Sequence, residues 1–316
     1  MSESALVSRR SPSRSQPGLW QRFWSRSNER IGYLFILPSL LHLAFFLVIP
    51  MLFSFYLSFH DWNGPKFQNA PFIGLGNYTF LAGDKRFWNA MRNTAYYTVL
   101  SVPLGMAVSL LIALVMNQKL RGIYFFRTLF FMPVISSWVA VSVIWITLLD
   151  PQVGIVNYVL KLAGLPAVNW LGDPRWAMPS IVLIAVWKGA GFNMVIWLAG
   201  LQAIPNELHE AAAIDGASRV QGFWHVTLPL LAPTTFFLAI TGVIGSFQVF
   251  SPVYVITKGG PLDSTDVVVF RIFQRAFAEF KMGYASSQAW VLFLIIFTAT
   301  LLQFWYMRRR GERLFL

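Results

Sequence analysis

Six long apolar segments constrain this chain more than any other feature, because about 20 apolar residues in a helix cross a bilayer core of about 30 Å. The segments run over residues 33–59, 94–116, 125–149, 178–201, 233–256 and 289–307. Only 12% of the 316 residues are charged, which is about half the share found in soluble domains. The sequence therefore predicts an all-α membrane protein with six transmembrane helices.

Residues 1–30 are polar and rich in Ser and Arg, and we expect a disordered basic tail there. Residues 31–316 then make up one six-helix transmembrane domain. A secretory signal peptide is the alternative for the N-terminal region, but its apolar core spans about 7–15 residues. The first apolar segment is longer and follows thirty polar residues. We therefore expect it to be retained as a membrane helix.

The net charge of +12 is better explained by membrane orientation than by nucleic-acid binding. No basic stretch outside the apolar segments is interleaved with the aromatic residues that stack on bases. Lys and Arg instead cluster in both tails and around the turn at 117–127, and such clusters mark the cytoplasmic side. Both termini, and the loop after the fourth segment, are therefore expected in the cytoplasm.

That loop, residues 203–229, contains a short polar and alanine-rich helix pattern between two apolar segments. Asn206 is the expected N-cap, with Glu207 near the positive helix end, and Gly216 is placed to end the helix. A helix of about nine residues is unstable alone in water, so it needs a partner. A second helix is expected from Ser218 to about Thr227, followed by prolines that set the return to the membrane.

The chemistry of this loop favours a protein partner over the lipid surface. A helix lying on anionic headgroups favours Lys and Arg on its polar face. The first helix instead carries Glu207, Glu210 and Asp215 with no Lys or Arg. Ala211 and Ala212 have small side chains, which allow another surface to approach the backbone closely.

The spacing of this loop resembles a known family motif. Glu210-Ala211-Ala212, three residues, Gly216, nine residues and Val226-Thr227-Leu228-Pro229 resemble the EAA motif of binding-protein-dependent ABC importer permeases, which commonly have Ile in place of Val226. The flanking stretches LAGLQAIPNELHEAAAIDGAS, TKGGP, MGYASSQAW and YLFILPSLL are similar to the carbohydrate-uptake branch, which includes the maltose, lactose and glycerol-phosphate types. The resemblance covers residues 31–316 and leaves out the Arg-rich tail.

The resemblance implies a type I ABC importer permease fold and a set of partners. These are a second homologous permease subunit, an ABC ATPase dimer, an extracytoplasmic solute-binding protein, membrane lipids and a sugar-type solute, with no nucleic acid. It also implies that the loop is a coupling helix that docks on the ATPase. The implied coupling residues are Glu207, Glu210, Ala211, Ala212, Asp215, Gly216, Leu228 and Pro229.

The chain is expected to be a non-catalytic subunit in the cytoplasmic (inner) membrane. It has no G-x-x-x-x-G-K-[ST] phosphate-binding loop, and its four histidines are not at metal-ligand spacing. We therefore predict no catalytic residue, no metal site and no cofactor on this chain. By the resemblance, ATP and Mg²⁺ belong to the partner ATPase.

Three polar residues inside the apolar segments are candidates for a solute path: Lys188, Asn193 and Gln248. A cation near the bilayer midplane costs about 2.5–3.5 kcal/mol on insertion scales, so Lys188 is expected to face a wet cavity or a polar partner. Hydrogen bonding between helices is the alternative for all three residues. The aromatic residues Trp187, Trp197 and Phe250 are candidates for stacking on sugar rings, with packing or lipid contact as the alternative.

The expected function is the membrane subunit of an importer for a sugar, oligosaccharide or polyol derivative, working by alternating access. A glycerol-3-phosphate importer is the first alternative, but it calls for several positive charges in the pore, and Lys188 is the one evident. A stand-alone secondary transporter is the second alternative, but proton-coupled carriers bury acidic residues in helices. Here every Asp and Glu is predicted to lie in a loop or tail.

Overall fold

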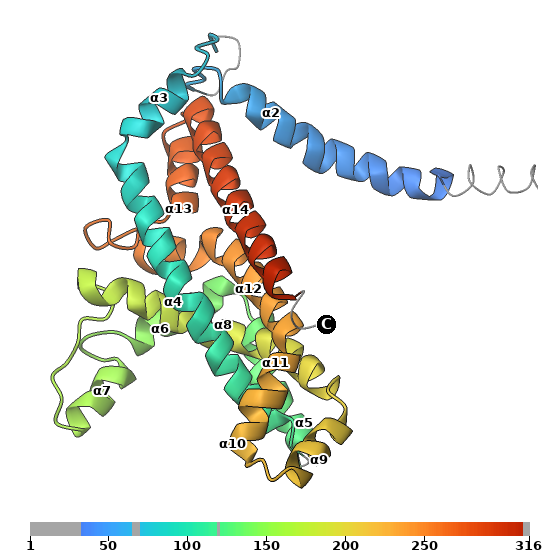
Figure 1. Cartoon of the computed structure of the whole chain (residues 1–316). Coiled ribbons are helices and arrows are strands. Elements are labelled where there is room, and N and C mark those ends of the chain that lie inside the picture. The colour runs from blue at the N-terminus through green and yellow to red at the C-terminus, as the bar shows by residue number, and fades with distance from the viewer. Residues whose placement is uncertain (1–32, 65–69, 119–120, 312–316) are drawn as a thin grey trace, which may run out of the picture. The chain divides into compact units, whose positions relative to one another are not determined.

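The computed structural model describes residues 33–64, 70–118 and 121–311, and its elements are helices apart from two isolated β-bridges (Figure 1). The predicted tail at 1–30 lies outside the described residues. The chain divides into two units between Ser54 and Phe55. In the first unit the chain is helical from Tyr33, with a π-helical turn η1 (Ala44–Val48), and the helix runs on through α2 (Ile49–Leu57). The first predicted span thus ends within two residues of the observed helix.

The second unit contains all remaining elements. In chain order they are α3 (Gly76–Gly83), α4 (Lys85–Met116), α5 (Ile123–Ile135), α6 (Trp138–Leu148), α7 (Ile155–Leu162), α8 (Pro174–Gln202), α9 (Asn206–Ile214), α10 (Arg219–Gly222), η3 (Phe223–Thr227), α11 (Leu228–Leu230), α12 (Ala232–Phe247), η4 (Val253–Thr257), α13 (Val268–Phe273), η5 (Gln274–Ala278) and α14 (Met282–Gly311). Short helices such as α3, α7 and α13 lie between the long apolar segments.

Among the described residues, four helices are long and apolar enough to cross a membrane as single spans, and these are Tyr33–Leu57, Lys85–Met116, Pro174–Gln202 and Met282–Arg309. Neither the third predicted span, 125–149, nor the fifth, 233–256, is one continuous helix, because α12 ends at Phe247 and residues 249 and 250 are not helical. The third segment is broken into α5 and α6 with a bend of 99°, and α12 is bent by 63° from the helical stretch before it. The count reaches six when each bent pair is taken as one span.

The break in the third segment follows from its local sequence. Pro133 lies in the last turn of α5, and a proline leaves a carbonyl one turn earlier without its amide partner. Ser136 and Ser137 then adopt extended backbone angles. The Ser137 hydroxyl accepts a hydrogen bond from the Val139 amide at 3.3 Å and so caps α6. The apolar run continues through the break, which is why hydropathy alone did not reveal it.

Helix α8 packs against both α4 and α5 and supplies much of the core. Trp197 of α8 is fully buried, and its indole Nε1 donates a hydrogen bond to the Ser109 hydroxyl of α4 at 3.1 Å. Trp197 was a candidate for stacking on a sugar ring or for packing, and the structure shows that it packs in the core. Trp187, on the same helix, is 45% exposed and its ring meets that of Trp145 edge-on.

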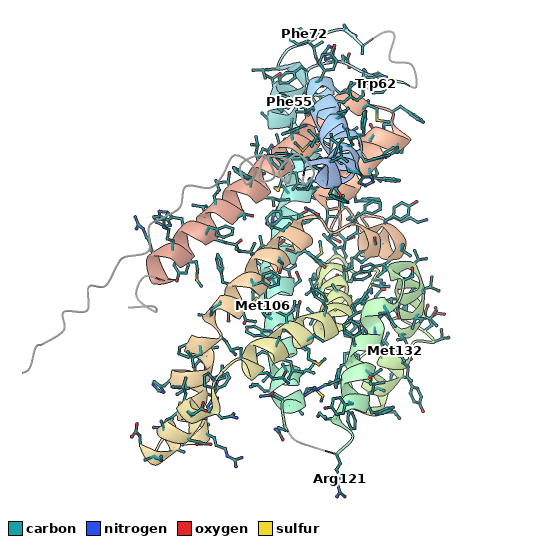
Figure 2. All side chains as sticks on the ribbon, turned by 90° about the vertical axis from the view of Figure 1, so that its right-hand side faces the viewer. Phe55, Trp62, Phe72, Met106, Arg121 and Met132 are labelled. Carbon is teal, nitrogen blue, oxygen red and sulfur yellow. The ribbon has the colours of Figure 1, made fainter. Side chains whose placement is uncertain are left out.

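One end of the second unit is tied together by backbone contacts. Isolated β-bridges join His60 to Phe72 and Asn63 to Lys281, at the start of α14. Figure 2 shows Trp62 and Phe72 at this end. A Cβ atom on Gly283 would lie 2.0 Å from the His60 carbonyl oxygen, so this close approach requires glycine at that position.

Candidate functional site

The loop at 203–229 forms the compact helical pair that the sequence predicts. Helix α9 has nine residues, Asn206–Ile214. Gly216 follows with φ +80°, and its amide donates to Ala213 O at 3.1 Å, while the Ala217 amide donates to Ala212 O at 2.9 Å. These two bonds form a Schellman motif, whose left-handed position favours glycine. The predicted left-handed turn at Gly216 is confirmed.

The starts of the two helices differ in how well the sequence revealed them. The prediction of Asn206 as N-cap is wrong, because Pro205 stands at the boundary with extended angles and Asn206 is already the first helical residue. No side chain caps α9 there. Helix α10 begins after Ser218, as predicted, and Ser218 and Gln221 form a reciprocal capping box with bonds of 3.3 and 2.8 Å. The S-x-x-Q spacing carried that signal.

Helix α9 buries none of its residues in this chain. Leu208 is 42% and Ile214 86% exposed, beside the exposed carboxylates of Glu207 and Glu210. A shallow hollow of about 330 Å³ lies between α9 and α10, and Ala212, Asp215 and Gly216 line it together with His225. Leu228 and Pro229 lie outside this hollow, in the short helix α11.

The position of the helical pair agrees with the charge pattern. Figure 1 shows α9 and α10 at the same end of the second unit as the turn between α4 and α5. Arg121 lies at the tip of that turn in Figure 2. The Arg127 guanidinium donates from the start of α5 to the Met116 carbonyl at the end of α4, at 2.7 Å. The basic turn and the acidic helix α9 therefore share one end.

A cavity of about 360 Å³ lies among α4, α6, α8, α12 and the stretch that follows α12. Its wall combines neutral polar and aromatic side chains with aliphatic residues and glycines, and Met106 of α4, labelled in Figure 2, is one of the apolar residues. The polar and aromatic lining residues are Tyr97, Ser101, Asn193, Ser246, Gln248, Ser251, Trp138 and Phe250. Among the described residues, the wall carries no charged side chain. A mixture of this kind suits hydroxyl groups and sugar rings.

Two of the three residues predicted for the solute path line the cavity, and the third does not. Asn193 and Gln248 both line the cavity, whereas Lys188 does not. Lys188 is 6% exposed, and its Nζ donates to the carbonyl oxygens of Pro133, Val134 and Ser136 at 3.0, 3.2 and 2.9 Å. Of the two expectations for Lys188, a wet cavity or a polar partner, the structure shows the polar partner.

Two charged clusters outside the spans were missed by sequence reasoning. Asp266 and Arg271 form a buried ion pair, and burial raises the pKa of Asp266 to about 6 although Arg271 opposes the shift. Asp84 caps α4 and accepts a hydrogen bond from the Tyr284 hydroxyl at 2.6 Å. Burial disfavours its charge, but the hydrogen bonds outweigh burial and lower its pKa. The expectation that every Asp and Glu lies in a loop or tail holds for Asp266, but it gave no hint of burial.

Comparison with known proteins agrees with this architecture. Residues 101–312 match the family model described as the binding-protein-dependent transport system inner membrane component. The probable ABC transporter permease protein YesP of Bacillus subtilis is 39% identical over 88% of this chain and 91% of its own length. The lactose transport system permease protein LacF of Rhizobium radiobacter is 35% identical, with 88% and 94% covered. The sn-glycerol-3-phosphate transport system permease protein UgpA of Agrobacterium fabrum is 31% identical, with 90% and 96% covered.

A solved structure shares the fold over most of the chain. A chain of a bacterial ABC transporter involved in the import of the acidic polysaccharide alginate superposes with a TM-score of 0.80 at 26% identity, covering 91% of this chain and 99% of that one. A chain of a bacterial alginate ABC transporter in complex with an alginate pentasaccharide-bound periplasmic protein gives a TM-score of 0.79 at 25% identity, covering 92% of this chain and 97% of that one.

The chain belongs to the family of binding-protein-dependent transport system inner membrane components. It is an all-α, multi-pass membrane protein with the fold of an ABC importer permease. The family and fold predicted from the EAA-like spacing and the apolar segments are confirmed.

Proposed function

We propose that this chain is the permease subunit of an ATP-driven importer for an uncharged sugar, oligosaccharide or polyol. The single observation that carries the proposal is helix α9, which ends in a Schellman turn at Gly216 and buries none of its own residues. A nine-residue helix with this exposure is marginal alone in water. We infer that a partner protein packs on α9 and stabilises it.

The proposed partner of α9 is an ABC ATPase dimer, which holds the ATP and Mg²⁺. Glu207, Glu210 and Asp215 are offered to a positively charged groove, and the small Ala211 and Ala212 allow close approach. Truncating one member of a desolvated charge pair costs about 2–5 kcal/mol. Motion of the ATPase would then reach α8 and α12, which flank α9 and α10 in the chain, and so alternate the access of the cavity.

The proposed solute class rests on the cavity wall. LacF is named for lactose and UgpA for glycerol phosphate, so the relatives allow both classes. Asn193, Gln248 and neighbouring hydroxyl groups suit sugar hydroxyls, and the rings of Trp138 and Phe250 suit a sugar face. A phosphate or uronate calls for Arg or Lys on the wall, and the described wall carries neither. This difference favours a neutral solute over glycerol phosphate.

The remaining partners and the orientation complete the proposal. A second permease subunit would close the path across the bilayer. A soluble binding protein outside the membrane would deliver solute to the end of the second unit that carries α3 and the start of α14. Both termini and the α9–α10 pair would face the cytoplasm, following the distribution of Lys and Arg.

Purification from the native membrane tests the proposal. The tagged chain should bring down an ABC ATPase, and proteoliposomes of the complex should take up a neutral sugar when ATP is supplied to the ATPase side. Glu210→Lys should lose the ATPase or its solute-stimulated hydrolysis, and Glu210→Gln should lose less. ATP-independent uptake driven by a proton gradient would refute the proposal. Uptake of glycerol 3-phosphate in preference to every neutral sugar tested would refute its solute class.

A further inference from the structure

The environment of Lys188 is complete without any solute. An ammonium group has three N–H donors, and Lys188 Nζ has three carbonyl acceptors within 3.2 Å, on Pro133, Val134 and Ser136. The side chain is buried, with 6% of the residue exposed. A cation that contacts solute in a pathway needs free N–H donors for water or solute. The three donors of Lys188 are instead hydrogen-bonded to backbone carbonyls.

The three carbonyls mark the end of helix α5, which closes at Ile135. The last carbonyls of a helix have no amide partners within the helix, and a cation there satisfies them and complements the helix dipole. The same point is the 99° bend between α5 and α6. Lys188 therefore fastens the bend to the middle of α8.

A second contact holds α5 against α8 close to Lys188. A Cβ atom on Gly191 would lie 2.2 Å from the Phe130 carbonyl oxygen, so the backbones of the two helices meet there directly. Gly191 and Lys188 lie three residues apart and therefore share one face of α8. The end of α5 is thus positioned both by backbone contact and by the ammonium group.

The bend is linked to the cavity through Trp138, the first residue of α6. Lys188 Nζ lies 5.1 Å from the centroid of the Trp138 ring, within the range of a cation–π contact. Trp138 lines the cavity, whereas Lys188 does not. The ring is the one part of this arrangement, among the residues just named, that a solute in the cavity can touch.

We propose that Lys188 is a positioning residue that holds the α5–α6 bend on α8 and thereby sets Trp138 on the wall of the solute cavity. Its charge serves the backbone and the ring rather than the solute. The assignment of the cavity to a solute rests on the proposed function, whereas the fixing of the bend by Lys188 does not.

The test uses the absence of cysteine from the sequence. Ser101→Cys places one thiol on the cavity wall, and its rate of modification is measured in the assembled transporter with an anionic and a cationic methanethiosulfonate. Lys188→Met is compared with Lys161→Met, the same substitution at an exposed lysine of α7. The proposal predicts that Lys188→Met changes both rates by a common factor, and that Lys161→Met leaves both unchanged.

A pathway cation predicts a different result. Removing a charge that faces the cavity lowers the anionic rate relative to the cationic rate by about tenfold. Such a fall in the ratio, or two unchanged rates, would overturn the proposal. Solute uptake gives a second readout, because a displaced Trp138 loses its aromatic contact with the solute and is expected to raise KM by about tenfold.

Lys188→Gln keeps the proposal testable if the methionine variant does not assemble. The carboxamide donates hydrogen bonds to the carbonyls without a charge. The proposal therefore predicts that KM rises less in Lys188→Gln than in Lys188→Met, and that the ratio of the two modification rates stays unchanged. A fall of about tenfold in the ratio of the anionic to the cationic rate in Lys188→Gln would contradict the proposal. Uptake by the parent transporter is measured first. If the parent imports no sugar, the proposed function fails, while the modification rates still decide the role of Lys188.

Discussion

The turn after α9 offers a matched pair of glycines for testing the coupling loop. Gly216 has φ +80°, whereas Gly222 is helical with φ −58°. A Cβ atom added at either position meets nothing within 4 Å, so the two positions differ in backbone conformation and not in space. Alanine in the left-handed region costs about 1–2 kcal/mol, whereas alanine for glycine inside a helix gains about 0.5–1 kcal/mol.

The cost at Gly216 falls on the turn that α9 needs in order to dock. One to two kcal/mol corresponds to a factor of about 5–30. We therefore expect Gly216→Ala to weaken the apparent affinity for the ATPase by about that factor, and Gly222→Ala to leave it unchanged or slightly stronger. The assay is ATPase retention on the immobilised permease across a concentration series, with solute-stimulated hydrolysis as the second measurement. Equal behaviour of the two variants would refute the reasoning.

Further predictions follow from single contacts. Gly191→Ala should lower the melting temperature in detergent, because its Cβ would lie 2.2 Å from Phe130 O, whereas Gly189→Ala meets nothing within 4 Å and should not. Ser109→Ala removes the acceptor of the Trp197 indole and should cost about 0.6–1.7 kcal/mol, measured by denaturant unfolding. The pKa of Asp266 is raised from 3.8 to about 6, so its stabilising contribution is full below pH 3.8 and is lost as the pH rises through about 6. A pH series of melting temperatures should show that decline, and Asp266→Asn should flatten it; an unchanged slope would contradict the assignment.

The spans and the coupling loop were readable from the sequence because their signals are local. Long apolar runs predicted α4, α8 and α14, Gly216 was predicted to end the first loop helix, and Ser218 was predicted to begin the second. The prediction of the α9 N-cap was wrong by one residue, because Pro205 and Asn206 are both compatible with a helix start and the structure has Pro205 at the boundary.

The bend, the cavity and the place of Lys188 depend on contacts between distant segments. Nothing in the apolar run from 125 to 149 separates a straight helix from a bent one except Pro133 and the two serines after it. Lys188 meets its acceptors 52–55 residues away in sequence. The Asp266–Arg271 pair is close in sequence, but its burial comes from packing of the surrounding helices. Hydropathy and spacing carry no information on such contacts.

The most direct test of the central claim is photo-cross-linking from the exposed tip of α9. A benzophenone amino acid replaces Ile214, which is 86% exposed, and Val153, which is 80% exposed in the turn before α7, serves as the control site. In the transporting complex, the account predicts an adduct between position 214 and the ATPase, and none from position 153. Full ATP-driven uptake with no ATPase adduct at position 214 would contradict it.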